Sequence, residues 1–209
     1  MLKVLSFDLD GTLFRKGTDD VFWNEKIPAL LAEKKKISFK KAQSFVLEEY
    51  KKVGLGDARW YIPEYWFNLF NLDTPLHTVL DTMNYAIGVY DDIDAIREFA
   101  KNYMIIISTN NPRSILEHKL KAFGCTDHIL ETFSSVSDFN KIVKNQHFYS
   151  QVCRKLGVRA EQVLHVGDDP FYDVSEPLAA GINAILMDRD GENNALHNLY
   201  DLLAILKNH

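Results

Sequence analysis

Two aspartates, Asp8 and Asp10, follow directly after the apolar run of residues 4–7. These apolar residues favour a β-strand, and Gly11 and Thr12 then end it. Residues two apart along a strand point to the same side, so both carboxylates are expected to face one space. At about 4 Å and an effective dielectric constant of about 20, two such charges repel by about 4 kcal/mol. The pair therefore needs a cation or a shared proton, unless the segment is an ordinary solvated turn after an edge strand.

A second acidic cluster lies near the other end of the chain, where Asp168, Asp169 and Asp173 follow the apolar pair Val163-Leu164. A second strand is therefore predicted to end in carboxylates. Placing the aspartates of two strand ends at one edge of a sheet is costly without a function, because like charges then gather in one place. The two clusters together favour a metal site over solvated turns.

These two segments resemble the haloacid dehalogenase-like (HAD) hydrolase superfamily. The sequence Asp8-Leu9-Asp10-Gly11-Thr12 matches the first motif of that superfamily, and Gly167-Asp168 with Asp173 matches the fourth. The resemblance covers nearly the whole chain. It implies an α/β fold with a doubly wound, parallel, Rossmann-like sheet and an inserted helical domain.

Strand and helix patterns alternate after residue 90, as a doubly wound sheet requires. Short apolar runs typical of buried parallel strands occur at 104–107, 163–166 and 184–187. Apolar residues at helical spacing predict helices at 91–100, 112–123, 148–156 and 195–206. We expect Asn111 to cap the second of these helices, with Pro112 at its first position.

Residues 13–90 show helical periodicity and no convincing strand. Ser38 and Gly54 are suitable start and stop residues for one helix, and a last helix is predicted from about Leu76 to Ile87. In the HAD superfamily, an insertion at this position is a C1-type cap that excludes water and selects the leaving group. The resemblance therefore implies a core of residues 1–14 and 89–209 and a cap of residues 15–88. Most of the aromatic block at 60–70 is expected to form the cap's own core, with one or two rings facing the substrate.

Residues 108–112 combine a strand end, small hydroxyl side chains and a helix start, which together make a site for an anion. The second motif of the superfamily is an apolar strand that ends in serine or threonine, commonly followed by asparagine. By this resemblance the role falls to Thr109, with Asn110 beside it. Ser108 is the alternative if the strand register differs.

The third motif of the superfamily is a lysine that holds phosphoryl oxygens and offsets the acidic cluster. Lys144 matches it best, because it lies just ahead of the helix predicted at 148–156. The match is irregular, since Asn145 stands where the superfamily often has proline. Lys141 is therefore the alternative.

The resemblance assigns a role to each of these residues. Asp8 is the nucleophile that forms an aspartyl-phosphate, and Asp10 is the general acid for the leaving oxygen and later the base for water. Thr109 and Lys144 hold the remaining phosphoryl oxygens. The implied cofactor is Mg²⁺, bound by the Asp8 carboxylate, the Asp10 carbonyl and the Asp168 carboxylate, with support from Asp173 or Asp169. His165 is interpreted as a structural residue.

The resemblance thus implies a Mg²⁺-dependent phosphatase that acts on a small phosphorylated metabolite. Asp10 argues against halide removal, because members that remove halogen from carbon lack this second aspartate. The open alternatives are a sugar phosphomutase, a phosphonate hydrolase that uses a cap lysine, a haloacid hydrolase on the same core, and a non-catalytic phospholigand-binding protein.

Composition and charge exclude several other function classes. The chain has 209 residues and a net charge of -5, which gives no electrostatic footprint for nucleic acid. Its apolar runs are too short for a membrane span, and its start does not resemble a signal peptide. The two cysteines, Cys125 and Cys153, are far apart in sequence and suggest a reducing compartment. We expect a cytoplasmic protein.

Overall fold

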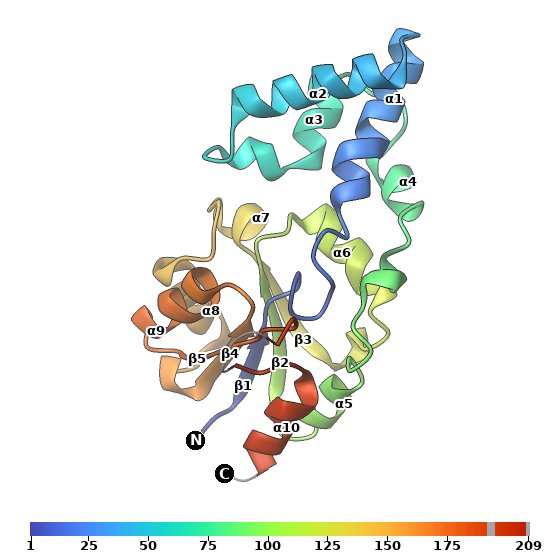
Figure 1. Ribbon diagram of the computed structural model, residues 1–209. Helices are drawn as coiled ribbons and strands as arrows, with labels where there is room; N and C mark the ends of the chain where they lie inside the picture. Colours follow the sequence, from blue (N-terminus) through green and yellow to red (C-terminus); the bar gives the residue numbers. More distant parts are fainter. Residues whose placement is uncertain (192–194, 208–209) are drawn as a thin grey trace.

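The computed structural model describes residues 1–191 and 195–207 (Figure 1). Its centre is a five-stranded sheet with the strand order β3-β2-β1-β4-β5, in which every neighbouring pair is parallel. The strands are β1 (Val4–Phe7), β2 (Met104–Thr109), β3 (Ile129–Ser134), β4 (Val163–Gly167) and β5 (Asn183–Leu186). This arrangement confirms the predicted α/β class and the parallel sheet.

Helices cover both faces of the sheet (Figure 1). Val4 and Ile106 pack on one face with Phe148 of α8 (Gln146–Leu156). Leu5 and Ile107 belong to the core on the opposite face. That core contains residues of α5 (Ala95–Phe99), α6 (Arg113–Ala122) and α10 (Leu199–Lys207). The sheet is therefore doubly wound, as predicted.

Strand β1 lies in the middle of the sheet, with β2 on one side and β4 on the other. The chain thus leaves β1 toward β2 and β3 and later crosses back to β4. In open α/β sheets, ligands bind outside the carboxyl ends of the strands at such a switch point. Asp8, Thr109 and Asp168 all lie at this edge, because each ends or directly follows one of these three strands.

Within residues 15–88, which we call the helical insertion, residues 27–69 lie beyond the carboxyl end of the sheet, whereas residues 85–88 lie beside α6 (Figure 1). The helices of the insertion are α1 (Ile27–Lys35), α2 (Phe39–Val53), α3 (Pro63–Leu69) and α4 (Leu76–Asp81). The Ser38 hydroxyl accepts a hydrogen bond from the Lys41 N–H at the start of α2, and Gly54 ends that helix, both as predicted.

The remaining short helices are α7 (Ser135–Phe139) and α9 (Glu176–Ala179). Single turns of 3₁₀ or π-helix occur at 22–26, 58–61, 85–88, 126–128, 160–162 and 170–175.

Three predicted helices are clearly shorter in the structure, and one of them, expected at 195–206, begins only at Leu199. The helix expected from Leu76 to Ile87 ends at Asp81, because the Thr82 hydroxyl and N–H both bond the Val79 carbonyl and tighten the last turn. The helix expected at 91–100 begins only at Ala95. The buried Asp92 carboxylate accepts hydrogen bonds from Arg189 and from the Leu199 N–H instead.

Strand β3 is absent from the sequence-based prediction. Its residues Leu130 and Glu131 are exposed, so the segment lacks the continuous apolar run of a central strand. It occupies the edge of the sheet beside β2. Among the described residues, no helix is long and apolar enough to cross a membrane.

Candidate active site

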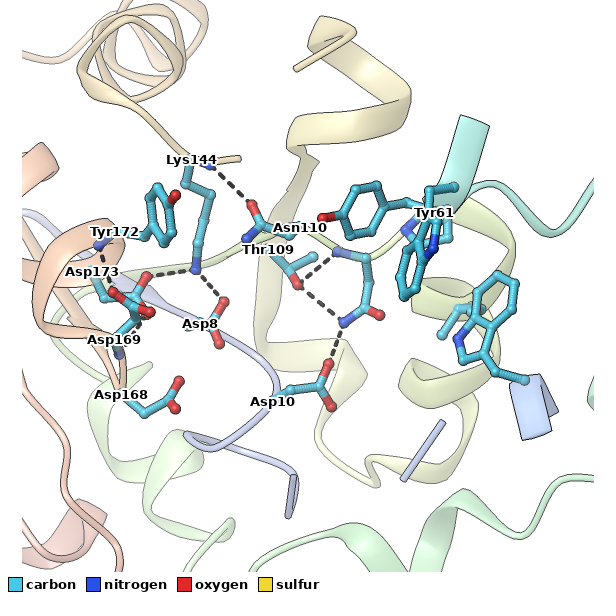
Figure 2. Close-up of a pocket in the computed structure, with 15 residues that line it drawn as sticks. Asp8, Asp10, Tyr61, Thr109, Asn110, Lys144, Asp168, Asp169, Tyr172 and Asp173 are labelled. Atoms are coloured by element: carbon cyan, nitrogen blue, oxygen red, sulfur yellow. Dashed lines mark hydrogen bonds and ion pairs between the residues drawn. The ribbon is translucent and has the colours of Figure 1, made fainter. Parts of the chain in front are cut away.

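A cavity of about 250 Å³ lies at the carboxyl ends of β1, β2 and β4 (Figure 2). Acidic residues from β1 and β4, polar residues from β2 and one lysine line its floor: Asp8, Asp10, Thr109, Asn110, Asn111, Lys144, Asp168, Asp169 and Asp173. The helical insertion adds Trp23, Trp60 and Tyr61 to the lining. The structure therefore brings every predicted site residue to one cavity.

Asp8, Asp168 and Asp173 form a group of carboxylates that suits a hard cation. Each offers one oxygen, and these oxygens all lie within 4.8 Å of one another. Two glycines beside this group, Gly11 and Gly167, have no space for a side chain. A Cβ on Gly167 would lie 2.3 Å from the Asp173 carboxyl carbon, and one on Gly11 would lie 2.4 Å from that of Asp168. An all-oxygen donor set held this closely fits Mg²⁺.

Burial raises the pKa of Asp8 well above its ordinary value, and the neighbouring carboxylates of Asp173 and Asp168 raise it further. The Lys144 ammonium opposes both effects without cancelling them. A carboxylate must be ionised to attack as a nucleophile. A positive charge beside Asp8 favours the ionised form, and Lys144 supplies one.

Lys144, which is 1% exposed, lies between the two buried carboxylates. Its ammonium donates to Asp8 and lies 2.6 Å from Asp173 Oδ1 (Figure 2). It also donates to the Ser108 carbonyl at 3.1 Å. Burial lowers the pKa of Lys144, but Asp173 and Asp8 more than offset this, so its pKa is raised and it stays charged. Lys144, and not the alternative Lys141, therefore lies beside the candidate nucleophile.

The irregular third motif has a local explanation. The Asn145 side chain accepts a hydrogen bond from the Phe148 N–H at 3.0 Å and so caps α8. The helix consequently begins at Gln146, two residues before the predicted start. The Lys144 N–H donates to Asn110 Oδ1 at 3.0 Å, which ties this turn to the end of β2. An N-capping asparagine thus starts the helix directly after Lys144 without a proline.

Asp10 is held from two directions. Its Oδ2 accepts a hydrogen bond from Asn111 Nδ2 at 2.5 Å, and its Oδ1 lies 2.5 Å from the Lys119 ammonium on α6. The prediction that Asn111 caps α6 is wrong, because Pro112 occupies the N-cap position and the Asn111 side chain turns to Asp10 instead. Lys119 was missed by the sequence-based prediction. One feature of the sequence could have identified it: Lys119 lies four residues after Ile115, on the apolar face of the predicted helix, where a charged residue is unexpected.

Thr109 faces the cavity and Ser108 does not. The Thr109 hydroxyl accepts hydrogen bonds from the Asn111 N–H at 3.1 Å and from its side-chain amide at 3.2 Å (Figure 2). The Ser108 hydroxyl is fully buried and accepts a hydrogen bond from Ser6 at 2.9 Å, on the side of the sheet covered by α8. The geometry therefore favours Thr109 over the register alternative.

The three aspartates after β4 have different surroundings. Asp168 Oδ2 lies 2.5 Å from the ammonium of the exposed Lys16. Asp169 Oδ1 accepts two hydrogen bonds of 2.8 Å from the Phe171 and Tyr172 N–H groups, so this carboxylate caps the following turn. Asp173, and not Asp169, belongs to the close group of oxygens.

His165 is buried in β4 outside the cavity lining. Its Nε2 lies 3.0 Å from Asp173 Oδ1 and 3.0 Å from the Tyr149 hydroxyl, and its Nδ1 lies 2.8 Å from Ser6 Oγ. Burial lowers the pKa of His165, so the neutral ring is favoured. These contacts agree with a structural role in fixing Asp173.

Comparisons with known proteins identify the family. Residues 2–181 match the family model of haloacid dehalogenase-like hydrolases. The GMP/IMP nucleotidase YrfG of Escherichia coli (strain K12) is 25% identical over 165 residues, which cover 77% of this chain and 72% of that protein. A HAD phosphatase from Thermococcus onnurineus shares 26% identity and a TM-score of 0.79 over 99% of this chain and 98% of that one. A 2-haloacid dehalogenase from Pseudomonas syringae pv. tomato DC3000 shares the fold, with a TM-score of 0.68, 19% identity and coverage of 100% and 99% of the two chains. The chain belongs to the haloacid dehalogenase-like hydrolases.

Proposed function

We propose that this hydrolase is a Mg²⁺-dependent phosphatase that cleaves a small phosphomonoester through an aspartyl-phosphate on Asp8. One observation carries the proposal: the Asp8 carboxylate and the Asp10 carboxylate line the same cavity, with the Lys144 ammonium against Asp8. A nucleophile, a proton donor and a fixed positive charge are the parts that phosphoryl transfer requires.

The proposed reaction has two steps. In the first, an Asp8 oxygen attacks phosphorus in line, the bond from phosphorus to the leaving oxygen breaks, and Asp10 protonates that oxygen. In the second, Asp10 takes a proton from water as the water attacks phosphorus, which frees Asp8 and releases phosphate. Lys144 and Thr109 bind the phosphoryl oxygens throughout. Mg²⁺ bound by Asp8, Asp168 and the Asp10 carbonyl, with support from Asp173, would neutralise the negative charge that gathers between nucleophile and phosphate.

The helical insertion is proposed to act as a cap over a core of residues 1–14 and 89–209. Three aromatic side chains of the insertion, Trp23, Trp60 and Tyr61, line the same cavity as the carboxylates. Apolar rings at this position exclude water from the reacting groups and contact the leaving group.

We further propose a nucleoside monophosphate as the substrate. The rings of Trp23 and Trp60 lie 6.2 Å apart with an interplanar angle of 26°, so they form a nearly parallel aromatic wall. Flat nucleobases stack favourably on such surfaces. The name of the Escherichia coli relative, a GMP/IMP nucleotidase, directs the first test to purine nucleotides.

Phosphate release from IMP, GMP and p-nitrophenyl phosphate tests this function directly. With Mg²⁺ present, the purified protein is expected to release phosphate, and excess EDTA should stop the release until Mg²⁺ is restored. Unchanged rates in EDTA would contradict the metal dependence. Transfer of phosphate to a second sugar hydroxyl in place of water would favour the phosphomutase alternative.

The aromatic wall leads to a separate prediction. Trp60→Ala should raise KM for IMP by about tenfold, because base stacking contributes about 1–3 kcal/mol, while KM for glycerol phosphate stays nearly unchanged. Phe45→Ala is a matched control, since Phe45 is an exposed ring on α2 outside the cavity lining. An equal rise in KM for both substrates would show that Trp60 shapes the cap in general and does not bind the base.

A further inference from the structure

A second buried lysine lies behind the cavity. The Lys119 side chain is fully buried, and its ammonium lies 2.5 Å from Asp10 Oδ1 and 2.6 Å from Asp19 Oδ2. Burial lowers the pKa of Lys119, but the carboxylates of Asp10 and Asp19 more than offset this, so its pKa is raised. A charged lysine thus joins the candidate general acid to a residue of the helical insertion.

Lys119 also contacts both ends of the helical insertion. Asp19 lies near its start, and Tyr85 lies near its end. The Lys119 ammonium lies 5.7 Å from the centre of the Tyr85 ring and 5.8 Å from that of Phe14. These distances allow cation–π attraction to both rings. The ammonium therefore lies between residues from the two ends of the insertion.

Lys119 does not line the cavity, so it has no direct route to a phosphoryl group there. It reaches the site only through Asp10. The Asp10 carboxylate is fixed at one oxygen by Asn111 and at the other by Lys119 and, at 3.3 Å, by the Thr18 hydroxyl. Removal of Lys119 leaves Oδ1 with only the longer hydrogen bond from Thr18, so the carboxylate plane is less firmly fixed.

We propose that Lys119 is a positioning residue that orients the Asp10 carboxylate for proton transfer and, through Asp19, links this orientation to the helical insertion. The inference rests on the proposed phosphatase function, in which Asp10 protonates the leaving oxygen. A proton donor must lie within hydrogen-bond reach of the atom it protonates, and a displacement of about 1 Å can cost about 100-fold in rate.

Leaving groups of different basicity separate this role from a general structural one. An alkoxide, such as the 5′-oxygen of a nucleoside, needs a proton as its bond to phosphorus breaks. The p-nitrophenolate ion leaves without that proton because it is a much weaker base. A misplaced Asp10 therefore lowers kcat/KM for alkyl phosphates more than for p-nitrophenyl phosphate.

The experiment measures kcat/KM for glycerol phosphate and p-nitrophenyl phosphate in Lys119→Met and Asp19→Asn. Lys121→Met is the matched control, because Lys121 lies on the same helix and its side chain is 67% exposed. In Lys119→Met, we expect kcat/KM to fall by about 10- to 100-fold for glycerol phosphate and by no more than about threefold for p-nitrophenyl phosphate. Asp19→Asn should show the same pattern more weakly, and Lys121→Met should match the wild type.

Equal losses for the two substrates in folded variants, or no loss, would overturn the inference while leaving the phosphatase function in place. If circular dichroism shows that Lys119→Met does not fold, Asp19→Asn decides, since asparagine has nearly the same size as aspartate. A wild-type protein that hydrolyses neither of these substrates nor IMP and GMP would overturn the phosphatase function, and the inference with it.

Discussion

Asp8→Asn is expected to lower kcat by about 10⁴-fold or more, because an amide oxygen cannot replace the attacking carboxylate. The fold should survive the change. Lys144 keeps a buried counter-ion in Asp173, whose Oδ1 lies 2.6 Å from the ammonium. The asparagine also removes a charge that repels Asp168 and Asp173. The loss is therefore expected in catalysis and not in stability.

Phosphate release and thermal unfolding by circular dichroism measure these two effects separately. Asp91→Asn is the matched control, because Asp91 is exposed and does not line the cavity. It should retain wild-type turnover. If Asp8→Asn keeps substantial activity with every substrate, Asp8 is not the nucleophile and the proposed mechanism is wrong.

The carboxylates of the site were predictable because their signal is local. Asp8 and Asp168 each follow a short apolar strand directly, and parallel strands must present their carboxyl ends at one edge of the sheet. The alternation of strand and helix patterns after residue 90 also predicted the doubly wound sheet. The resemblance to the superfamily then identified Lys144, which the local sequence alone did not distinguish from Lys141.

The residues that surround Asp10 were not predictable in the same way. Lys119 meets Asp10 across 109 residues of sequence, and nothing near either residue signals the partner. Asn111 was assigned to helix capping because asparagine before proline commonly starts a helix, yet its amide bonds Asp10 and Thr109. In both cases the partner is Asp10, which is about 100 residues away in the sequence, so the local sequence does not indicate the contact. Strand β3 was missed because an edge strand lacks the apolar run of a central one.

Lys144→Met is expected to lower the free energy of unfolding by about 3–5 kcal/mol and to abolish turnover. Lys144 neutralises Asp8 and Asp173, which are 7% and 1% exposed. Without the ammonium, both carboxylates stay buried beside Asp168 with no lysine between them. Mg²⁺ should restore part of the lost stability, because a divalent cation neutralises the same oxygens.

The pH dependence of this loss distinguishes unpaired charge from lost packing. Removal of Lys144 raises the folded-state pKa of Asp8 and Asp173, and a carboxyl group with a raised folded pKa loses stability as pH rises through that pKa. The deficit of Lys144→Met, measured by urea unfolding in EDTA, should therefore be larger at about pH 8 than at about pH 5. Lys141→Met, the matched control, should change the free energy of unfolding by less than about 1 kcal/mol. If the loss in free energy of unfolding does not depend on pH or Mg²⁺, Lys144 acts through the packing of its aliphatic chain. A loss that grows with pH and shrinks with Mg²⁺ would show that the charge of Lys144 holds the acidic cluster together.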